Sequence, residues 1–269
     1  MKINDPDLIF SKTNLWDSYL KVEGELAKAQ SQIGLIPKKA AANIYKNAKL
    51  SVVGSNNIEQ SFAITKSLIL SIVQELSKKC SREAGGYVHW GGTTRNIIDT
   101  GRNLLVREAH RNILHNVSIS IKKLSDLSIK YSETPMLGRT MGQNAVPISF
   151  GFKVAGWIES LIRLDSKFKH AEASIFTLLF GGAVGAMHGF NGKGYELTQK
   201  LASNLGFNNS IVPNRTSIET SINYLLALSF QGMILGKIAN EIYNLMSQSI
   251  NEISEKQTKG QVGSSTMPH

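Results

Sequence analysis

The stretch TSIETSINYLLALSFQGMILGKIANEIYNLMSQSINEISE, residues 216–255, decides the fold. It contains no proline, and its apolar residues recur three or four positions apart, from Ile218, Ile222 and Leu225 onward to Leu245. This period places them on one face of a very long α-helix. Such a helix cannot bury its apolar stripe alone, so we expect it to pack beside other long helices.

The same period recurs in other segments of the chain. It predicts helices over residues 15–33, 38–48, 58–79, 96–131, 146–176 and 195–205. Gly34 follows the first of these as a C-cap, and Pro37 suits the first turn of the next. Strand patterns are absent. We therefore expect an all-α fold with a small N-terminal helical domain, residues 1–100, and a central long-helix bundle, residues 101–269.

Composition narrows the class of protein. A chain of 269 residues that is 42% hydrophobic can bury a substantial core. Cys80 is the only cysteine, so the chain cannot form an intramolecular disulfide, which fits a reducing compartment. The N-terminus lacks the pattern of a signal peptide, and we expect a cytoplasmic protein. The longest run without charged residues, 173–192, contains a glycine cluster and His188, which favours a buried turn region over a membrane helix.

The net charge of +10 attracts anions. Charge alone does not choose among nucleic acid, an acidic membrane surface and a small polyanionic substrate. The lysines are spread along the chain, as Lys122 and Lys123 illustrate, and no dense basic run is interleaved with aromatic residues. This spread favours a solvated basic surface, and we expect neither nucleic acid nor membrane as a partner.

Three polar segments are candidate sites. The first is HWGGTTRNIIDT, residues 89–100, where glycines let the backbone approach a ligand and threonines lead into a helix. This arrangement suits a carboxylate. An ordinary interpretation also fits, with Thr94 as an N-cap and His89 as a hydrogen-bonded core residue. The segment by itself leaves both open.

The other two segments also allow both a functional and an ordinary interpretation. In GRTMGQNAVP, residues 138–147, a polar turn precedes a long helix, and Arg139 can hold a carboxylate by two parallel hydrogen bonds or simply lie on the surface. In GQVGSSTMPH, residues 260–269, consecutive hydroxyls and backbone amides fit either a mobile lid or a frayed tail.

Taken in order, the three segments resemble the three signature regions of the fumarase and aspartase superfamily. The third matches the start of the family's highly specific loop, Gly-Ser-Ser-x-Met-Pro-x-Lys-x-Asn. His269, in the variable position before the expected lysine, resembles the branch of 3-carboxy-cis,cis-muconate cycloisomerase and adenylosuccinate lyase, as does the His-Trp-Gly of residues 89–91. The resemblance covers nearly the whole chain, including residues 23–37 and 180–185.

The resemblance implies an enzyme. It implies a lyase or cycloisomerase that acts on a di- or tricarboxylate: a general base removes a proton beside a carboxylate, and the dianionic intermediate expels a leaving group. In the cycloisomerase this chemistry is run as lactone closure. The resemblance also implies a homotetramer whose active sites combine several subunits, and it implies no metal or organic cofactor.

Residue roles follow from the same resemblance. Ser264 matches the serine base and His89 an active-site histidine. The substrate-holding positions are matched by Thr93, Thr94, Arg139, Thr140, Gln143, Ser265 and Met267. A serine acts as a base only when its alkoxide is stabilised, so amides, hydroxyls and cations are expected around Ser264. The three segments are expected to converge from three different subunits.

The chain departs from the family pattern at several positions. Met141 follows Gly-Arg-Thr where members with fumarase-like or adenylosuccinate chemistry have histidine, and a thioether transfers no proton. This favours the cycloisomerase group. Thr94 and Asn96 stand where Ser and Asp are usual, and Ile218 and Asn240 each stand where the arginine of an Arg-Asp pair is common. These changes indicate an altered pocket or a chain relaxed from catalytic selection.

The chain stops at His269, before the signature lysine and asparagine, the return helix and the C-terminal domain of the family. We therefore expect a fragment or truncated product that is inactive alone, with apolar helix faces that another chain covers. A non-catalytic helical scaffold is the alternative to an enzyme. Among enzymes, the alternative to the cycloisomerase is a C–N elimination like that of adenylosuccinate lyase.

Overall fold

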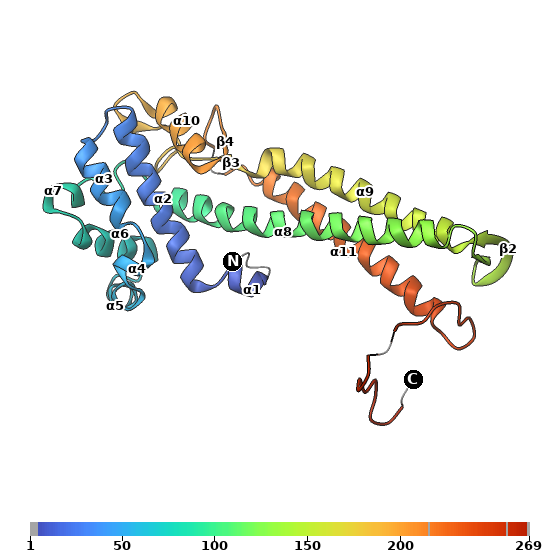
Figure 1. Ribbon diagram of the computed structural model, residues 1–269. Helices are drawn as coiled ribbons and strands as arrows, with labels where there is room; N and C mark the ends of the chain where they lie inside the picture. Colours follow the sequence, from blue (N-terminus) through green and yellow to red (C-terminus); the bar gives the residue numbers. More distant parts are fainter. Residues whose placement is uncertain (1–4, 215, 257, 268–269) are drawn as a thin grey trace. The chain divides into compact units, whose positions relative to one another are not determined.

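The structure, a computed structural model, describes residues 5–214, 216–256 and 258–267 apart from the Pro6 side chain, and it consists mainly of α-helices (Figure 1). The helices are α1 (Pro6–Ile9), α2 (Lys12–Gln32), α3 (Lys38–Asn47), α4 (Leu50–Val53), α5 (Ser55–Thr65), α6 (Leu68–Lys79), α7 (Arg82–Gly85), α8 (Thr94–Lys130), α9 (Phe150–Ile175), the 3₁₀ turn η1 (His188–Phe190), α10 (Gly194–Leu205) and α11 (Glu219–Leu245). The strands are β1 (Pro135–Thr140), β2 (Gln143–Ser149), β3 (Thr177–Leu178) and β4 (Asn208–Asn209). The all-α class predicted from the sequence is confirmed.

The chain forms two compact units. Unit 1 comprises residues 1–117 and 166–225, and unit 2 comprises residues 118–165 and 226–269. Each unit takes part of α8, α9 and α11, because a unit boundary crosses each of these long helices. The domain boundary that the sequence indicates near residue 100 stays a prediction.

Helix α2 is the centre of unit 1 and packs against α3, α6 and α10. It ends in a Schellman motif: the Leu35 N–H donates to the Gln30 carbonyl at 2.8 Å and the Gly34 N–H donates to the Ser31 carbonyl at 3.2 Å. Gly34 has φ +73°, so the C-cap predicted there is confirmed. The fully buried core side chains of unit 1 include Leu20, Leu26, Ile44, Ile58, Ile72, Phe180 and Phe190.

Unit 2 is held together by a smaller apolar cluster. Val154, Trp157 and Ile238 are its buried members. The partly buried side chains packed around them are Leu124, Leu127, Phe150, Ile158, Ile234 and Ile242. These residues recur at helical spacing on α8, α9 and α11, so the apolar period seen in the sequence marks the faces that meet in this unit.

Some helix boundaries differ from the prediction. The single helix predicted over residues 58–79 is two helices, because Lys66 adopts a left-handed conformation with φ 54° between α5 and α6. The last helix ends at Leu245 rather than near residue 255. The Ser247 hydroxyl donates to the Asn244 carbonyl there, and such local side-chain bonds compete with continued helix.

The segment between α8 and α9 is a β-hairpin, so the prediction that strand patterns are absent is wrong for residues 135–149. Arg139 pairs with Asn144 and Thr140 with Gln143. Met141 and Gly142 form the two-residue turn with φ of 53° and 70°. Positive φ at both central positions is the signature of a type I′ turn, which matches the twist of the flanking strands.

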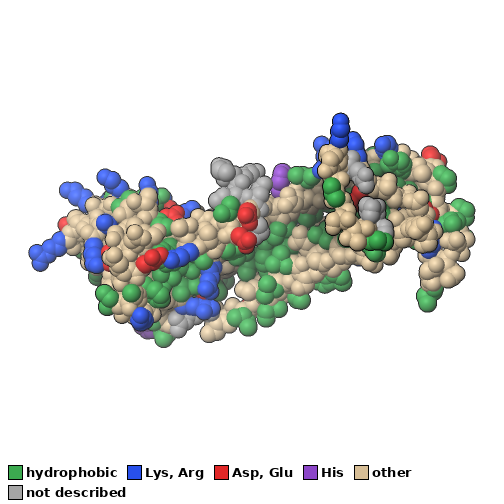
Figure 2. Space-filling model, turned by 90° about the horizontal axis from the view of Figure 1, so that it is seen from below, with side chains coloured by type: hydrophobic (Ala, Val, Ile, Leu, Met, Phe, Trp, Pro, Cys, Tyr) green, Lys and Arg blue, Asp and Glu red, His purple; other side chains and the backbone are tan. Residues whose placement is uncertain are grey.

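Helix α11 carries apolar side chains that this chain leaves exposed. They include Ile222, Leu225, Leu226, Met233 and Tyr243. Figure 2 shows hydrophobic side chains that are open to solvent in the view drawn there. Among the described residues, α11 is the one helix long and apolar enough to cross a membrane, with 11% of its apolar window buried. Core helices of soluble proteins have the same length and composition, so this property alone does not identify a membrane helix.

The turn geometry yields a stability prediction. Met141 has a positive φ that costs an unbranched, non-glycine residue about 1 kcal/mol, whereas asparagine is favoured at this position of a type I′ turn. We expect Met141→Asn to raise the free energy of unfolding by about 0.5–1 kcal/mol, measured by urea unfolding and by amide hydrogen exchange in β1 and β2. Gly142→Ala is the control and should destabilise the hairpin. Unchanged or lower stability in Met141→Asn would contradict the turn assignment.

Candidate active site

The first candidate segment is a turn that leads into α8 and is held from two sides. The Gln30 side chain of α2 donates a hydrogen bond to the Trp90 carbonyl at 2.7 Å. The Trp90 indole donates in turn to the Gly189 carbonyl at 3.2 Å and stacks on Tyr87 with ring centroids 5.4 Å apart. These contacts join the turn to α2 and to the segment around η1, so the position of His89 is fixed by unit 1 itself.

Two glycines allow this turn to approach the η1 segment closely. A Cβ atom at Gly91, where φ is +69°, would lie 2.3 Å from the Phe190 ring. A Cβ atom at Gly189 would lie 2.8 Å from the Gly91 Cα. Real side chains do not tolerate such distances, so glycine is required at both positions.

His89 forms a buried pair with Glu23 of α2. The His89 Nδ1 and the Glu23 Oε1 lie 2.6 Å apart, and the Glu23 side chain is fully buried. The second oxygen of Glu23, Oε2, is buried without a hydrogen-bond partner among the described residues. Burial, the largest influence, lowers the pKa of His89, but the hydrogen bond and the charge of Glu23 together outweigh it and leave that pKa raised. The ring is therefore held in one orientation and holds a proton more strongly than an ordinary histidine.

The start of α8 is tied to the turn that follows α9. The buried Asn96 side chain donates from Nδ2 to the Leu179 carbonyl at 3.0 Å and accepts at Oδ1 from the Gly182 N–H at 3.0 Å. An aspartate carboxylate could accept a hydrogen bond here but could not donate one. The need for both explains why asparagine replaces the family's usual Asp. Thr93 is half-buried and Thr94 is exposed at the first turn of α8.

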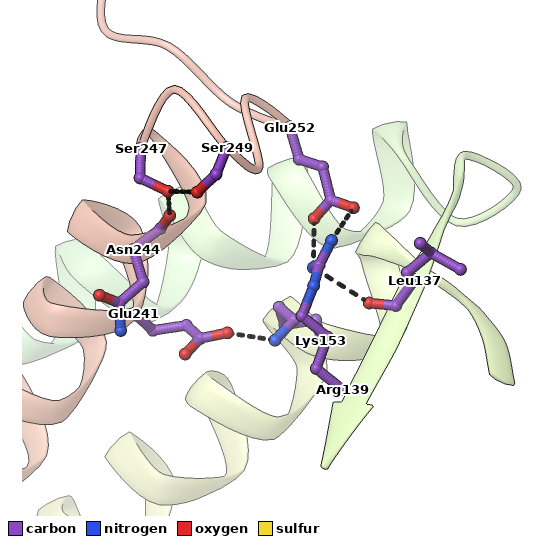
Figure 3. A network of polar contacts seen from close by, with 8 residues as sticks. All are labelled: Leu137, Arg139, Lys153, Glu241, Asn244, Ser247, Ser249 and Glu252. Atoms are coloured by element: carbon purple, nitrogen blue, oxygen red, sulfur yellow. Dashed lines mark hydrogen bonds and ion pairs between the residues drawn. The ribbon is translucent and has the colours of Figure 1, made fainter. Parts of the chain in front are cut away.

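In unit 2, Arg139 already binds a carboxylate (Figure 3). Its Nη1 and Nη2 donate to Oε2 and Oε1 of Glu252 at 2.8 and 2.9 Å, a bidentate pair. The hydrogen bond from Arg139 is the largest influence that lowers the pKa of Glu252, and the same pair raises the pKa of Arg139. Lys153 pairs with Glu241 in the same network. Arg139 thus binds the Glu252 carboxylate in the geometry that was expected for a substrate carboxylate.

The remaining candidates of unit 2 lie on exposed segments. Thr140 and Gln143 flank the hairpin turn with exposed side chains, and Met141 is 97% exposed. The half-buried Ser264 accepts hydrogen bonds at Oγ from the N–H groups of Thr266 and Met267, at 3.2 and 3.0 Å. Backbone amides at the serine oxygen are among the groups expected there.

The candidate site residues are divided between the two units. His89 and Thr93 belong to unit 1, whereas Arg139 and Ser264 belong to unit 2, as do Thr140, Gln143, Ser265 and Met267. Within the described parts of unit 2, no recorded hydrogen bond or ion pair joins Arg139 to the loop of Ser264. Ser265 and Met267 have exposed side chains, and His269 lies outside the described residues.

Sequence reasoning missed two partners, Glu23 and Glu252. A signal existed for Glu23, because it lies four residues after Tyr19 and three before Leu26, on the buried face of α2. A carboxylate at a core position requires a partner. No signal existed for Glu252, which pairs with a residue 113 positions away. No group of three or more His, Cys, Asp or Glu side chains that could hold a metal occurs in the described part of the chain.

The His89 pair predicts a pH dependence. Because the folded pKa of His89 is raised, the pair's contribution to stability is full below the unfolded value of about 6.5 and is lost as pH rises through the folded pKa. We expect Glu23→Gln to lower the His89 pKa in an NMR titration and to cost more stability at about pH 5.5 than at about pH 8.5. His89→Asn, alone and combined with Glu23→Gln, completes a double-mutant cycle. A coupling energy independent of pH would refute the charged pair.

Comparison with known proteins places the chain in a family. A family model described as lyase matches residues 6–269. N-acetyl-S-(2-succino)cysteine lyase from Enterococcus italicus is 37% identical over 93% of this chain and 55% of its own length. Adenylosuccinate lyase from Methanocaldococcus jannaschii is 32% identical over 97% of this chain and 57% of its own. A solved structure, the 3-carboxy-cis,cis-muconate lactonizing enzyme from Pseudomonas putida, superposes with a TM-score of 0.85 at 27% identity, covering 91% of this chain and 56% of that one.

These matches agree with the three signature segments and with the long helices. The chain spans a little more than half the length of the curated relatives it matches. The family model nevertheless extends along almost all of this chain, and relatives more than 30% identical cover nearly all of it. The chain belongs to the fumarase and aspartase superfamily of lyases.

Proposed function

We propose that the protein acts as a lyase on a substrate that carries a succinyl group. A base removes a proton beside one carboxylate, and the intermediate expels the sulfur or nitrogen leaving group on the neighbouring carbon. The observation that carries this proposal is the 37% identity, over 93% of the chain, to an N-acetyl-S-(2-succino)cysteine lyase. A second relative is an adenylosuccinate lyase, and its name likewise refers to a succinate unit.

Ser264 is the proposed base. A serine hydroxyl is a weak base unless its alkoxide is stabilised, and hydrogen bonds to the charged form lower the pKa of such a group. The N–H groups of Thr266 and Met267 already point at its Oγ. These two donors support the assignment, because they would remain in place as the alkoxide forms.

His89 and Arg139 are proposed to hold the negative charges of the substrate. The buried Glu23 keeps the His89 ring oriented and its pKa raised, so that the ring can carry a proton toward a developing charge. Arg139 offers a bidentate fork for a carboxylate, which then has to replace Glu252. The other substrate-holding positions remain as proposed from the sequence: Thr93, Thr94, Thr140, Gln143, Ser265 and Met267.

A cycloisomerase is the second candidate. Met141, 97% exposed at the hairpin turn, brings no proton donor to the position after Gly-Arg-Thr. Lactone closure needs no leaving-group donor at that position, and the muconate lactonizing enzyme shares the fold at a TM-score of 0.85. A non-catalytic helical scaffold is the candidate from another class, supported by the changes at Ile218 and Asn240.

The substrate class can be tested directly. The protein is assayed by ultraviolet absorbance with an S-succinyl thiol, an N-succinyl amine and a carboxymuconate. Formation of fumarate from either succinyl compound is expected. Turnover of the carboxymuconate alone would favour the cycloisomerase, and turnover of none of the three would favour the scaffold.

The assignment of Ser264 predicts a specific kinetic change. In the active enzyme, Ser264→Ala should lower kcat by about 10²–10⁴-fold with little change in KM, because the base acts in proton removal and not in holding the substrate. Ser265→Ala is the matched control for loss of a loop hydroxyl and should raise KM more than it lowers kcat. Turnover by Ser264→Ala at the wild-type rate would rule the serine out as base.

We also propose a cytoplasmic homotetramer with active sites shared between subunits. The support is the apolar side chains that α11 leaves exposed in a single chain, among them Leu225 and Leu226, which are 60% and 52% exposed. A covered apolar face lowers the free energy of the assembly by about 25 cal/mol per Å² of buried apolar area. In such an assembly the other subunits would bury the apolar face of α11, and the helix would need no membrane to cover it.

Light scattering tests the assembly. We expect a mass near four times the 29.5 kDa of one chain. The double variant Leu225→Glu/Leu226→Glu should shift the mass toward the monomer, because charges would be buried at the interface. Ile211→Glu, at an exposed apolar residue outside α11, is the control and should leave the mass unchanged. A stable wild-type monomer at micromolar concentration would exclude the tetramer.

A further inference from the structure

An open pocket of ≈ 760 Å³ lies in unit 1, beside the middle of α8 and the last turns of α9 and α10. Its volume is in the range of small-molecule sites. Four cationic side chains line it, Lys21 of α2, Arg107 and Arg111 of α8, and Lys169 of α9. Glu172 is the only carboxylate among the described residues that line it. None of the candidate active-site residues contributes to it.

Arg107 is held in place at the wall of this pocket. Its Nη1 donates to the carbonyls of Leu205 and Gly206 at 2.8 and 2.7 Å, which places the cation at the negative C-terminal end of α10. Its guanidinium also lies over the Phe207 ring, 4.6 Å from the centroid. Both hydrogen bonds come from Nη1, so Nη2 and Nε stay outside them. A cation fixed in this way loses little conformational entropy when a ligand binds.

The two arginines repel each other in the unliganded pocket. Arg107 and Arg111 lie four residues apart on one helix, a spacing at which like charges destabilise the helix. Burial is the first cause that lowers the pKa of Arg107, and the charge of Arg111 is the second. Glu108 offsets part of this charge through a contact with Arg111 at 3.4 Å. A ligand with several negative charges would remove the remaining repulsion.

The rest of the lining suits an oxyanion. Ser203, Asn204 and Asn208 add neutral polar groups around the cations. The Glu172 carboxylate contacts the buried His110 ring, with Oε2 and Nε2 3.5 Å apart, so one of its oxygens faces the protein interior. The pocket therefore presents mainly positive charge, with neutral polar groups beside it. Such a lining discriminates between anions by their charge.

We propose that this cationic pocket is a second binding site, separate from the candidate active site, for a small anion with two or more negative charges. The shared chemistry is that of phosphoryl or clustered carboxylate groups. A phosphorylated metabolite and a polycarboxylic acid are the two sources of that chemistry. The pocket is larger than either charged group alone and accommodates the body of a small metabolite.

Calorimetric titration of the 269-residue chain tests the site at low ionic strength. The probes are pyrophosphate, citrate and the monovalent acetate. Saturable binding of pyrophosphate or citrate is expected, and acetate should bind at least about tenfold more weakly. Stronger binding of pyrophosphate identifies a phosphoryl ligand, and stronger binding of citrate identifies a polycarboxylate. Absence of saturable binding by both would overturn the proposal.

Charge-matched variants locate the binding. Lys21→Gln/Arg111→Gln should weaken binding about tenfold or more, because two charge-assisted contacts are lost. The control Lys46→Gln/Lys79→Gln removes two charges from exposed positions on α3 and α6 and should change the affinity less than about twofold. Equal weakening by both pairs would reduce the effect to net charge and refute a defined site.

Two further variants keep the test independent of folding and of the active site. Lys169→Gln removes a third pocket cation from an exposed position and should also weaken binding, while circular dichroism verifies that each variant keeps its helix content. Arg139→Gln should leave binding unchanged. Loss of binding in Arg139→Gln but not in the pocket variants would assign the anion to the candidate active site and overturn the proposal.

Discussion

The candidate site of unit 1 depends on a backbone contact between two turns. The turn at Gly91 touches the segment of Gly189 and Phe190 so closely that a single methyl group at either glycine would lie within 3 Å of other atoms. Only this approach lets the Trp90 indole reach the Gly189 carbonyl. The contact therefore fixes the backbone position of His89, the residue before Trp90. From this position the His89 side chain reaches the Glu23 carboxylate of α2.

A second tie fixes the other end of the same turn. Asn96 uses both ends of its amide, one on the Leu179 carbonyl and one on the Gly182 N–H, and it is 2% exposed. Buried hydrogen bonds of this kind are costly to break, because each orphaned group loses its solvation as well. The start of α8 is thus held to the turn after α9. The amide at this position, a departure from the family's aspartate, is consistent with an intact local structure and gives no sign of a relaxed one.

The sequence predicted the long helices well, but it did not predict the carboxylate partners of His89 and Arg139. The apolar period located α8, α9 and α10, because a helix shows its buried face every three or four residues. The glycine at position 34 marked the C-cap of α2. The β-hairpin was missed, because Met141-Gly142 lacks the usual Asn-Gly signal of a type I′ turn. The Glu23 pair could be inferred from a charge on an apolar face. The Arg139 pair depends on tertiary packing across 113 residues and leaves no local trace.

The ion pair of Arg139 limits what any ligand can gain at this guanidinium. On the proposed function, a substrate carboxylate replaces Glu252, so the free energy gained is the difference between two bidentate pairs and not the whole of one. A monocarboxylate that makes only this contact gains almost nothing. A substrate with a second carboxylate gains from further contacts in addition to this one. The Glu252 carboxylate at Arg139 therefore lowers the affinity for every carboxylate ligand. It lowers the affinity for a monocarboxylate most, and so it selects for dicarboxylates.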